Sequence, residues 1–494
     1  MSSHPVVIMG AGPAGLTAAY ELAKGGVSSL TVEATDTVGG LSQTGFYKGY
    51  RFDIGGHRFF TKVSVVEELW KEILPDDLLT RSRMSRIYYN GKFFAYPLKP
   101  FNALMGLGLF ETFRCVASYG WANLFPAKPE DDFGTWVSNR FGKRLFNIFF
   151  KTYTEKVWGI PCHEIQAEWA AQRIKGLSLF TAVKNALIGE TAKRKEDVVK
   201  TLIDEFLYPR HGPGMMWERA RDLIQERGSS VTLDTPVERI HWEEGRGVIS
   251  IEAGGETHKA EHFISSIAIR DLIEALSPAP PEDVLTAART LKYRDFLTVA
   301  LMIRGTDLFP DNWIYIHDSN VAMGRVQNFS NWSPEMVPDP ETSCLGLEYF
   351  CFEGDDLWSA PDEELIERGK REISYLKLAN PDDIFDGAVV RMKKAYPVYD
   401  GAYSAAMAKV REFLKRLPNL QLTGRNGMHR YNNQDHSMLT AMLAARNILG
   451  GKYDLWQVNV DQEYHEEGKS ITLEDIRQME ATQPLVPRRI DESK

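Results

Sequence analysis

The first forty residues combine two apolar runs with a helical pattern between them. An apolar run at residues 6–9 predicts a buried strand, residues 16–24 have helical periodicity, and a second apolar run covers residues 30–32. Parallel strands need a crossover connection, which is usually a helix. The order strand, helix, strand therefore predicts an α/β fold that begins with a βαβ unit.

The remaining chain falls into blocks of different period. Residues 101–205 are mainly helical by pattern, and residues 363–378 and 437–449 predict two more helices. The dipeptide Asn90-Gly91 predicts a hairpin turn. Further strands are predicted at 230–240, 248–252, 262–266, 296–303, 313–317, 344–352 and 420–422. The strands between 296 and 352 predict a second, mostly antiparallel sheet.

Glycines follow the first strand in the spacing G-x-G-x-x-G, at Gly10, Gly12 and Gly15. The first glycine allows a tight turn, the second lets the backbone approach a pyrophosphate, and the third lets the helix pack close to the strand. Glu33 ends the second strand and is placed to accept from ribose hydroxyls. The motif therefore predicts a Rossmann-type dinucleotide site with the pyrophosphate at the helix N-terminus.

A second pair of glycines, Gly39 and Gly40, favours FAD over NAD, because a large cofactor needs a further close approach of the backbone. We expect Val237, at a strand end, to lie near the adenine. The late strand at 420–422 is followed by Gly424, and this unit predicts a second helix N-terminus at the same FAD. No covalent attachment motif is evident, so the FAD is expected to be non-covalent.

With 494 residues, the chain is too long for one ordinary core. The predicted domains are a FAD-binding domain, an inserted helical substrate domain, a sheet-rich substrate domain and a C-terminal extension. In residue numbers these are 1–100 with 208–290 and 415–450, then 101–207, 291–414 and 451–494.

Composition and charge narrow the class of protein. The net charge of −9 and the lack of a basic run argue against nucleic-acid binding. The four cysteines are widely spaced, which argues against a disulfide framework and fits a reducing compartment. No signal-peptide pattern precedes the first strand, so we expect a cytoplasmic protein. No metal site is predicted, and the sequence leaves the oligomeric state open.

The segment 101–125 is the most apolar long stretch, but Glu111 and Arg114 interrupt it. Each charge costs about 2.5–3.5 kcal/mol at a bilayer centre on insertion scales. A buried or amphipathic surface helix is therefore favoured over a span, and contact with a membrane surface stays open.

Candidate chemistry gathers around the sequence Gly55-Gly56-His57 and the block from Tyr153 to Gly159, YTEKVWG. Paired glycines at Gly55 and Gly56 suit backbone against a flat ligand, and His57 beside them is a candidate for contact with the flavin; a structural histidine is the alternative. Taken alone, Arg173 and Arg325 fit ordinary surface ion pairs. Tyr349 and Tyr396 fit ordinary core aromatics with a satisfied hydroxyl.

Together these stretches resemble the UDP-galactopyranose mutase family, within the wider amine-oxidase-like FAD group. The block with Trp158 and the downstream Arg173 is similar to the family's YTEKxWG block and substrate-binding arginine. The resemblance implies that Arg325 is a second diphosphate-binding arginine, that Tyr349 and Tyr396 approach the diphosphate, that Trp158 contacts the nucleotide, and that Gly424 and Arg425 bind FAD. Phe60 replaces a family histidine, and an inserted helix separates Tyr349 from Tyr396.

The resemblance implies a pyranose/furanose mutase acting on a glycosyl diphosphate, with reduced flavin as the nucleophile at the anomeric carbon. The substrate would be a nucleotide- or lipid-linked sugar. The alternative is an FAD-dependent oxidoreductase of the amine oxidase, protoporphyrinogen oxidase or desaturase type. A mutase pocket must supply cations, whereas an oxidase pocket for an apolar substrate should have few charges.

Overall fold

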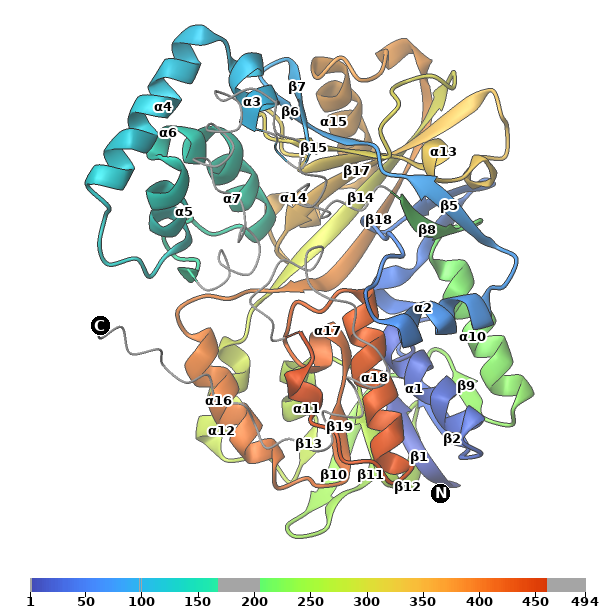
Figure 1. Cartoon of the computed structure of the whole chain (residues 1–494). Helices are drawn as coiled ribbons and strands as arrows, with labels where there is room; N and C mark the ends of the chain where they lie inside the picture. Colours follow the sequence, from blue (N-terminus) through green and yellow to red (C-terminus); the bar gives the residue numbers. More distant parts are fainter. Residues whose placement is uncertain (1, 97, 99, 168–204, 460–494) are drawn as a thin grey trace, which may run out of the picture.

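The computed structural model describes residues 2–96, 98, 100–167 and 205–459, which form two large sheets and a helical lobe (Figure 1). The α/β class predicted from the sequence is confirmed. The apolar residues form separate cores around the first sheet, on the two sides of the second sheet, and inside the helical lobe.

The first sheet contains the predicted βαβ unit. Strand β1 (Ser2–Met9) leads into helix α1 (Pro13–Lys24), and strand β2 (Ser29–Val32) returns parallel to β1. The strand order is β13-β10-β11-β12-β1-β2-β9, with β19 beside β12. The remaining strands are β9 (Ser230–Thr232), β10 (Val237–Glu243), β11 (Gly247–Ala253), β12 (Glu256–Ser265), β13 (Leu276–Ser277) and β19 (Leu420–Leu422).

The strand predicted over residues 230–240 is two strands at different places in this sheet. Strand β9 pairs with β2, whereas β10 pairs with β11. Asp234 between them has a positive φ of 50°, which ends the extended conformation. Alternation of side chains cannot reveal such a break, because both halves keep the pattern of a strand.

The second sheet is mostly antiparallel, as predicted, and has the order β18-β14-β17-β16-β15-β6-β7. Its strands are β6 (Ser85–Tyr89), β7 (Lys92–Ala95), β14 (Tyr293–Arg304), β15 (Trp313–Ile316), β16 (Arg325–Asn328), β17 (Thr342–Cys351) and β18 (Ile384–Pro397). The predicted FAD-binding domain included residues 85–95. In the structure these residues belong to the second sheet and not to the nucleotide-binding sheet. The reason is a parallel pairing of β6 with β15, supported by an ion pair between Arg86 and the buried Asp311.

The helical lobe lies beside the second sheet (Figure 1). It consists of α3 (Pro100–Leu107), α4 (Leu109–Leu124), α5 (Phe133–Phe141), α6 (Lys143–Phe146), a π-helical turn at Asn147–Lys151, and α7 (Thr152–Trp158). No helix in the described residues is long and apolar enough to cross a membrane.

The other elements connect the sheets and cover their faces. The strands are β3 (Thr44–Tyr47), β4 (Tyr50–Asp53), β5 (Leu78–Ser82) and β8 (Glu205–Pro209). The longer helices are α2 (Ser64–Ile73), α10 (Gly214–Glu226), α12 (Glu282–Thr290), α15 (Asp362–Tyr375), α16 (Tyr403–Leu414) and α18 (Gln434–Ile448). Short helices are α11 (Ile269–Glu274), α13 (Phe329–Trp332), α14 (Asp356–Ser359) and α17 (Gly424–Gly427). Of the predicted C-terminal extension, residues 460–494 lie outside the described part.

Candidate active site

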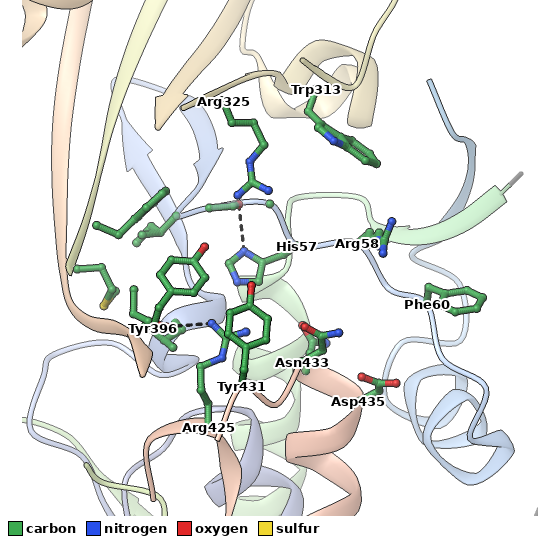
Figure 2. A pocket seen from close by; sticks show the side chains of 18 of the residues that line it. His57, Arg58, Phe60, Trp313, Arg325, Tyr396, Arg425, Tyr431, Asn433 and Asp435 are labelled. Atoms are coloured by element: carbon green, nitrogen blue, oxygen red, sulfur yellow. Dashed lines mark hydrogen bonds between the residues drawn. The ribbon is translucent and has the colours of Figure 1, made fainter. Parts of the chain in front are cut away.

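A cavity of about 220 Å³ opens where segments of the two sheets meet (Figure 2). Its lining combines backbone glycines, aromatic rings and three arginines, with one carboxylate. The lining residues are Leu41, Ile54, Gly55, Gly56, His57, Arg58, Phe60, Tyr96, Phe296, Trp313, Tyr315, Arg325, Trp332, Met392, Ala395, Tyr396, Arg425, Tyr431, Asn433, Gln434 and Asp435.

The predicted dinucleotide turn has the required geometry. Gly10 has a φ of 99°, and a Cβ on Gly15 would lie 1.8 Å from the Gly10 carbonyl oxygen, so only glycine lets α1 pack this closely. Gly12 caps α1 without a side-chain hydrogen bond. The N–H groups of the first turn of α1 are thus not blocked by a capping side chain, which suits a pyrophosphate.

The second glycine pair faces the first turn. Gly39 donates its N–H to the Ala11 carbonyl at 2.9 Å. A Cβ on Gly40 would lie 3.1 Å from the Gly12 Cα, and one on Gly12 would lie 3.7 Å from the Gly40 Cα. Two turns without side chains therefore approach each other, as a cradle for a cofactor backbone requires.

Glu33 lies against the same turn. Its carboxylate accepts from the Ala11 N–H at 2.8 Å and from the Thr35 N–H at 3.1 Å. The Glu33 carbonyl accepts from the Thr235 N–H at 2.7 Å, so the loop before Val237 is fixed beside the acid. These residues fit the adenosine half of FAD, with Glu33 placed for the ribose and Val237 beside it. Their contacts with the cofactor stay predictions.

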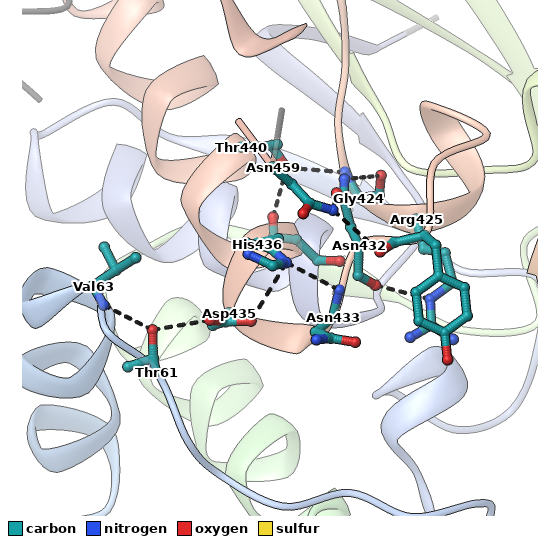
Figure 3. Close-up of polar contacts among 12 residues, drawn as sticks. Thr61, Val63, Gly424, Arg425, Asn432, Asn433, Asp435, His436, Thr440 and Asn459 are labelled. Carbon is teal, nitrogen blue, oxygen red and sulfur yellow. Dashed lines mark hydrogen bonds and ion pairs between the residues drawn. The ribbon is translucent and has the colours of Figure 1, made fainter. Parts of the chain in front are cut away.

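The N-terminus of α18 reaches the cavity through Asn433, Gln434 and Asp435 (Figure 3). Thr61 donates to Asp435 at 3.0 Å, and Ser42 donates to Gln434 at 3.0 Å, so α18 is tied to both the His57 loop and the second glycine pair. The predicted second helix N-terminus is present at the cavity.

Gly424 and Arg425 begin helix α17 below the cavity. Gly424 has a φ of 79° and donates to Thr440 at 3.0 Å. Arg425 donates to the carbonyls of Asn432 at 2.9 Å and Ala395 at 3.0 Å. Gly424 therefore sets the backbone, while the guanidinium of Arg425 links α17 to β18 at the cavity wall.

His57 lies in the cavity wall, on the loop that the glycine pair allows. Its Nδ1 is 3.1 Å from the Gly55 carbonyl oxygen, and because a carbonyl only accepts, Nδ1 carries the hydrogen and Nε2 the lone pair. Burial, the charge of Arg425 and, less strongly, that of Arg325 lower the pKa of His57 to about 3. His57 is therefore a neutral imidazole near neutral pH.

Arg325 begins β16 and points into the cavity from the second sheet (Figure 2). Its Nε donates to the fully buried Glu348 at 2.6 Å, and its Nη2 pairs with the same carboxylate. Gln327 donates to the other Glu348 oxygen at 2.6 Å. Arg325 is thus fixed from behind, and within the described residues its Nη1 makes no hydrogen bond. A Cβ on Gly56 would lie 3.4 Å from the Arg325 Cζ, so the glycine lets the guanidinium approach the His57 loop.

Tyr396 and Tyr431 form a stacked pair opposite Arg325, with ring centroids 5.6 Å apart. The guanidinium of Arg425 lies 4.9 Å from the Tyr431 ring centre. Trp158 is buried behind the pair, with centroids 6.0 Å from Tyr431 and 6.3 Å from Tyr396. Trp158 does not line the cavity but supports its aromatic wall, and its contact with a nucleotide stays a prediction.

Tyr349 is not at the cavity. It is buried in the core on the other face of β17, and its hydroxyl donates to Glu372 at 3.3 Å. Successive side chains of a strand point to opposite faces, and here Glu348 takes the face toward Arg325. The prediction that Tyr349 approaches the substrate is therefore wrong. Arg173 lies outside the described residues.

Lys156, in the YTEKVWG block, has a role that the sequence did not indicate. Its buried ammonium donates to the carbonyls of Ile316, at 3.3 Å, of Met323, at 3.1 Å, and of Asp318. Burial lowers the pKa of Lys156 to about 8. The side chain thus holds the turn between β15 and β16, which ends two residues before Arg325.

Several lining residues were not selected from the sequence. Arg58 and Asp435 had no recognisable motif, and Tyr96, Trp313 and Tyr315 resembled ordinary strand aromatics. Glu348 does not line the cavity but holds Arg325 from behind, and the sequence did offer a signal for it, because its neighbour Tyr349 was selected and side chains alternate between the two faces of β17.

The fold and the cavity define the class of protein. The family described as flavin containing amine oxidoreductase matches residues 13–449, and the chain belongs to this family. FAD is its cofactor, and the protein is a flavoenzyme. The residues at α1, Glu33 and α18 fit that cofactor.

Individual proteins add detail within the family. The crystal structure of reduced UDP-galactopyranose mutase superposes with a TM-score of 0.82 at 22% identity, over 95% of this chain and 100% of that one. Wild-type putrescine oxidase bound to putrescine gives a TM-score of 0.61 at 16% identity, over 90% and 99% of the two chains. The likeness to the mutase predicted from the sequence is confirmed for the fold.

Among curated relatives, the 15-cis-phytoene desaturase of Arabidopsis thaliana is 24% identical over 411 residues, or 79% of this chain and 66% of the desaturase. A ferredoxin–NADP reductase of Gluconacetobacter diazotrophicus is 38% identical over only 73 residues, 15% of this chain and 21% of its own length. The chain thus spans about a fifth to two-thirds of the length of these relatives.

Proposed function

We propose that this flavoenzyme acts on a glycosyl diphosphate as a pyranose/furanose mutase. The observation that carries the proposal is the charge of the cavity, which Arg58, Arg325 and Arg425 line together with one carboxylate, Asp435. Three guanidinium groups suit the oxygens of a diphosphate. A protonated amine would meet net repulsion from these groups, and an apolar polyene would offer their free N–H groups no acceptor.

Reduced FAD supplies a nucleophile for the anomeric carbon in such a reaction. In the proposal, Arg325 binds the diphosphate through the Nη1 that its ion pair with Glu348 leaves available. Tyr396 and Tyr431 wall the sugar site, and their stacking limits the orientations available to the substrate. Neutral His57 accepts a hydrogen bond from a sugar hydroxyl at Nε2, since its Nδ1 hydrogen is held by Gly55.

The experiment uses the FAD-loaded protein, reduced with dithionite, and UDP-galactopyranose as the first probe. We expect a furanose product in the presence of reduced flavin, with no oxygen uptake and no reductant consumed per turnover. Arg325→Ala should weaken ligand binding by about 1.5–3 kcal/mol, the typical value for a charge-assisted hydrogen bond, without loss of FAD. Arg325→Lys should recover only part of the lost ligand affinity, because lysine lacks the planar guanidinium with its two parallel N–H donors.

The alanine variant is made both alone and with Glu348→Gln, because loss of Arg325 leaves a buried carboxylate unpaired. Arg289→Ala removes an exposed arginine of α12 and serves as the matched control. Stoichiometric oxygen uptake with an amine, polyene or porphyrinogen, and no isomerisation of any glycosyl diphosphate, would establish the oxidoreductase alternative instead.

A further inference from the structure

Helix α4 carries its apolar side chains toward solvent. Six of them, Leu109, Phe110, Phe113, Val116, Trp121 and Leu124, form one stripe that we call the apolar ridge. Their exposed fractions run from 44% for Val116 to 91% for Leu109. Residues spaced by three and four share a helix face, so the ridge runs the length of the helix. An exposed apolar surface of this size marks an interaction site.

The opposite face of α4 packs on the protein through Cys115, Tyr119 and polar groups. Glu111 accepts from Arg144, and the Ser118 hydroxyl accepts from the Arg144 N–H at 3.1 Å. Cys115 is the buried residue of this helix. A helix that packs on its own core normally turns its apolar face inward. In α4 the arrangement is reversed, so the sequence places the ridge outward for a partner.

We propose that the apolar ridge docks on the surface of a lipid bilayer, with α4 lying in the interface. Leucine, phenylalanine and tryptophan on one face of a helix are the side chains that interfacial helices insert. Figure 1 shows α4 at the outer margin of the helical lobe. Because no described helix can span a membrane, the contact is peripheral.

Shape favours lipid over a second copy of the chain. The ridge is the convex crest of one helix, and a second such crest buries it only where the side chains of the two helices interdigitate in register. A stable protein interface buries roughly 800 Å² per partner with close complementarity. Fluid acyl chains conform to a ridge without a matching groove.

The charge of the helical lobe is also compatible with a lipid surface. Helices α3 to α6 carry Arg114, Arg140, Lys143 and Arg144 against one acidic residue, Glu111, in a chain whose net charge is −9. Glu111 is paired with both Arg114 and Arg144. The loop after α4 adds Lys128, Glu130, Asp131 and Asp132, so residues 100–146 carry five basic and four acidic side chains. The lobe is thus close to neutral while the rest of the chain is acidic, and anionic headgroups repel this part of the protein least.

The test is flotation of the FAD-loaded protein with vesicles of phosphatidylcholine and phosphatidylglycerol in a 7:3 ratio, a composition of roughly physiological anionic content. We expect the protein to float with the vesicles. Phe113→Asp should lower the partition coefficient at least about tenfold, because burial of one phenylalanine is worth more than that factor. Phe46→Asp is the matched control, since Phe46 is 67% exposed on β3, away from the ridge, and should bind like the wild type.

Brominated lipid gives a second readout. Quenching of tryptophan fluorescence on vesicle binding should fall in Trp121→Phe, because Trp121 is the ridge tryptophan. Equal flotation of wild type and Phe113→Asp, or no flotation of either, would overturn the proposal. So would a dimer in light scattering that Phe113→Asp converts to monomer without any vesicle binding. Isomerase activity on a soluble nucleotide sugar is measured separately, so the proposed function and the membrane contact can fail independently.

Discussion

At the scale of single residues, the cofactor site depends on glycines, because they have no Cβ. Gly12 and Gly15 belong to one motif, yet the structure gives them different neighbours. A Cβ on Gly12 meets only Gly40, whose Cα and N lie at 3.7 and 3.9 Å, whereas one on Gly15 would overlap the Gly10 carbonyl oxygen at 1.8 Å. The first glycine therefore keeps space for the cofactor, and the second keeps the strand and helix together.

The two glycines should consequently fail in different ways. We expect Gly12→Val to fold and to lose FAD, because its methyl groups fill the gap between the two glycine turns. Gly15→Ala should lower the free energy of unfolding by roughly 1–3 kcal/mol, as overpacking does, and lose FAD with it. Flavin absorbance per protein and urea denaturation measure the two effects. Normal FAD content in Gly12→Val would show that the pyrophosphate does not lie at this turn.

At the scale of elements, the turn between β15 and β16 rests on one side chain. Lys156 binds three carbonyls of this turn. Its pKa falls from 10.5 in the unfolded chain to about 8 when folded. Between these values the unfolded state binds the proton and the folded state does not, so this group makes the protein more stable as the pH rises from about 8 to 10.5.

Lys156→Met should remove both the hydrogen bonds and this pH dependence. We expect a loss of about 1–3 kcal/mol in the free energy of unfolding, the usual cost of leaving buried carbonyls unpaired, and the loss should grow above pH 8. Because the turn precedes Arg325, ligand affinity should also fall while FAD content stays normal. The measurement is urea denaturation from pH 7 to pH 10, compared with Lys143→Met, an exposed lysine of the same lobe. A penalty independent of pH would mean that the ammonium is not desolvated.

Elements were predictable from the sequence where a local pattern decides them. The βαβ unit, the Asn90-Gly91 hairpin and helices α15 and α18 follow from periodicity and turn residues. Pairing between distant strands does not, which is why residues 85–95 joined the second sheet and residues 230–240 divided into two strands. The side chains of the FAD site follow a motif with fixed spacing. The side chains of the substrate site follow no such motif. Whether Glu348 or Tyr349 faces Arg325, for example, depends on which face of β17 is turned toward the cavity.

At the scale of the whole molecule, three histidines in separate places are held as neutral rings, His317 and His429 in the core and His57 partly exposed in the cavity wall. His57 lines the cavity, His317 stacks on Tyr153 with centroids 4.8 Å apart, and His429 packs against Tyr293 at 4.6 Å. Burial is the main cause that lowers the pKa to about 3 for His57 and His317 and about 4 for His429, from 6.5.

Acid should therefore unfold the protein through these residues. As the pH falls below 6.5, the unfolded state takes up protons before the folded state does, so the free energy of unfolding decreases. The limiting slope is about 1.4 kcal/mol per pH unit for each histidine. Urea denaturation between pH 4 and pH 7 should show a slope that His317→Gln reduces by one proton. His163→Gln, at an exposed side chain, is the matched control.

The packing of α1 against α18 also sets the order in which the molecule can be completed. The glycine turn follows β1, and β1 pairs with β12, where Val6 lies opposite His262. Strand β12 pairs in turn with β19, so the sheet around the turn is complete only when these later strands have formed. Helix α18, which brings the second N-terminus to the cofactor, comes last. During synthesis the dinucleotide motif therefore emerges long before β12, β19 and α18, which complete its site. We therefore expect FAD to bind after α18 has formed, and its binding energy to stabilise the packing of α1 against α18.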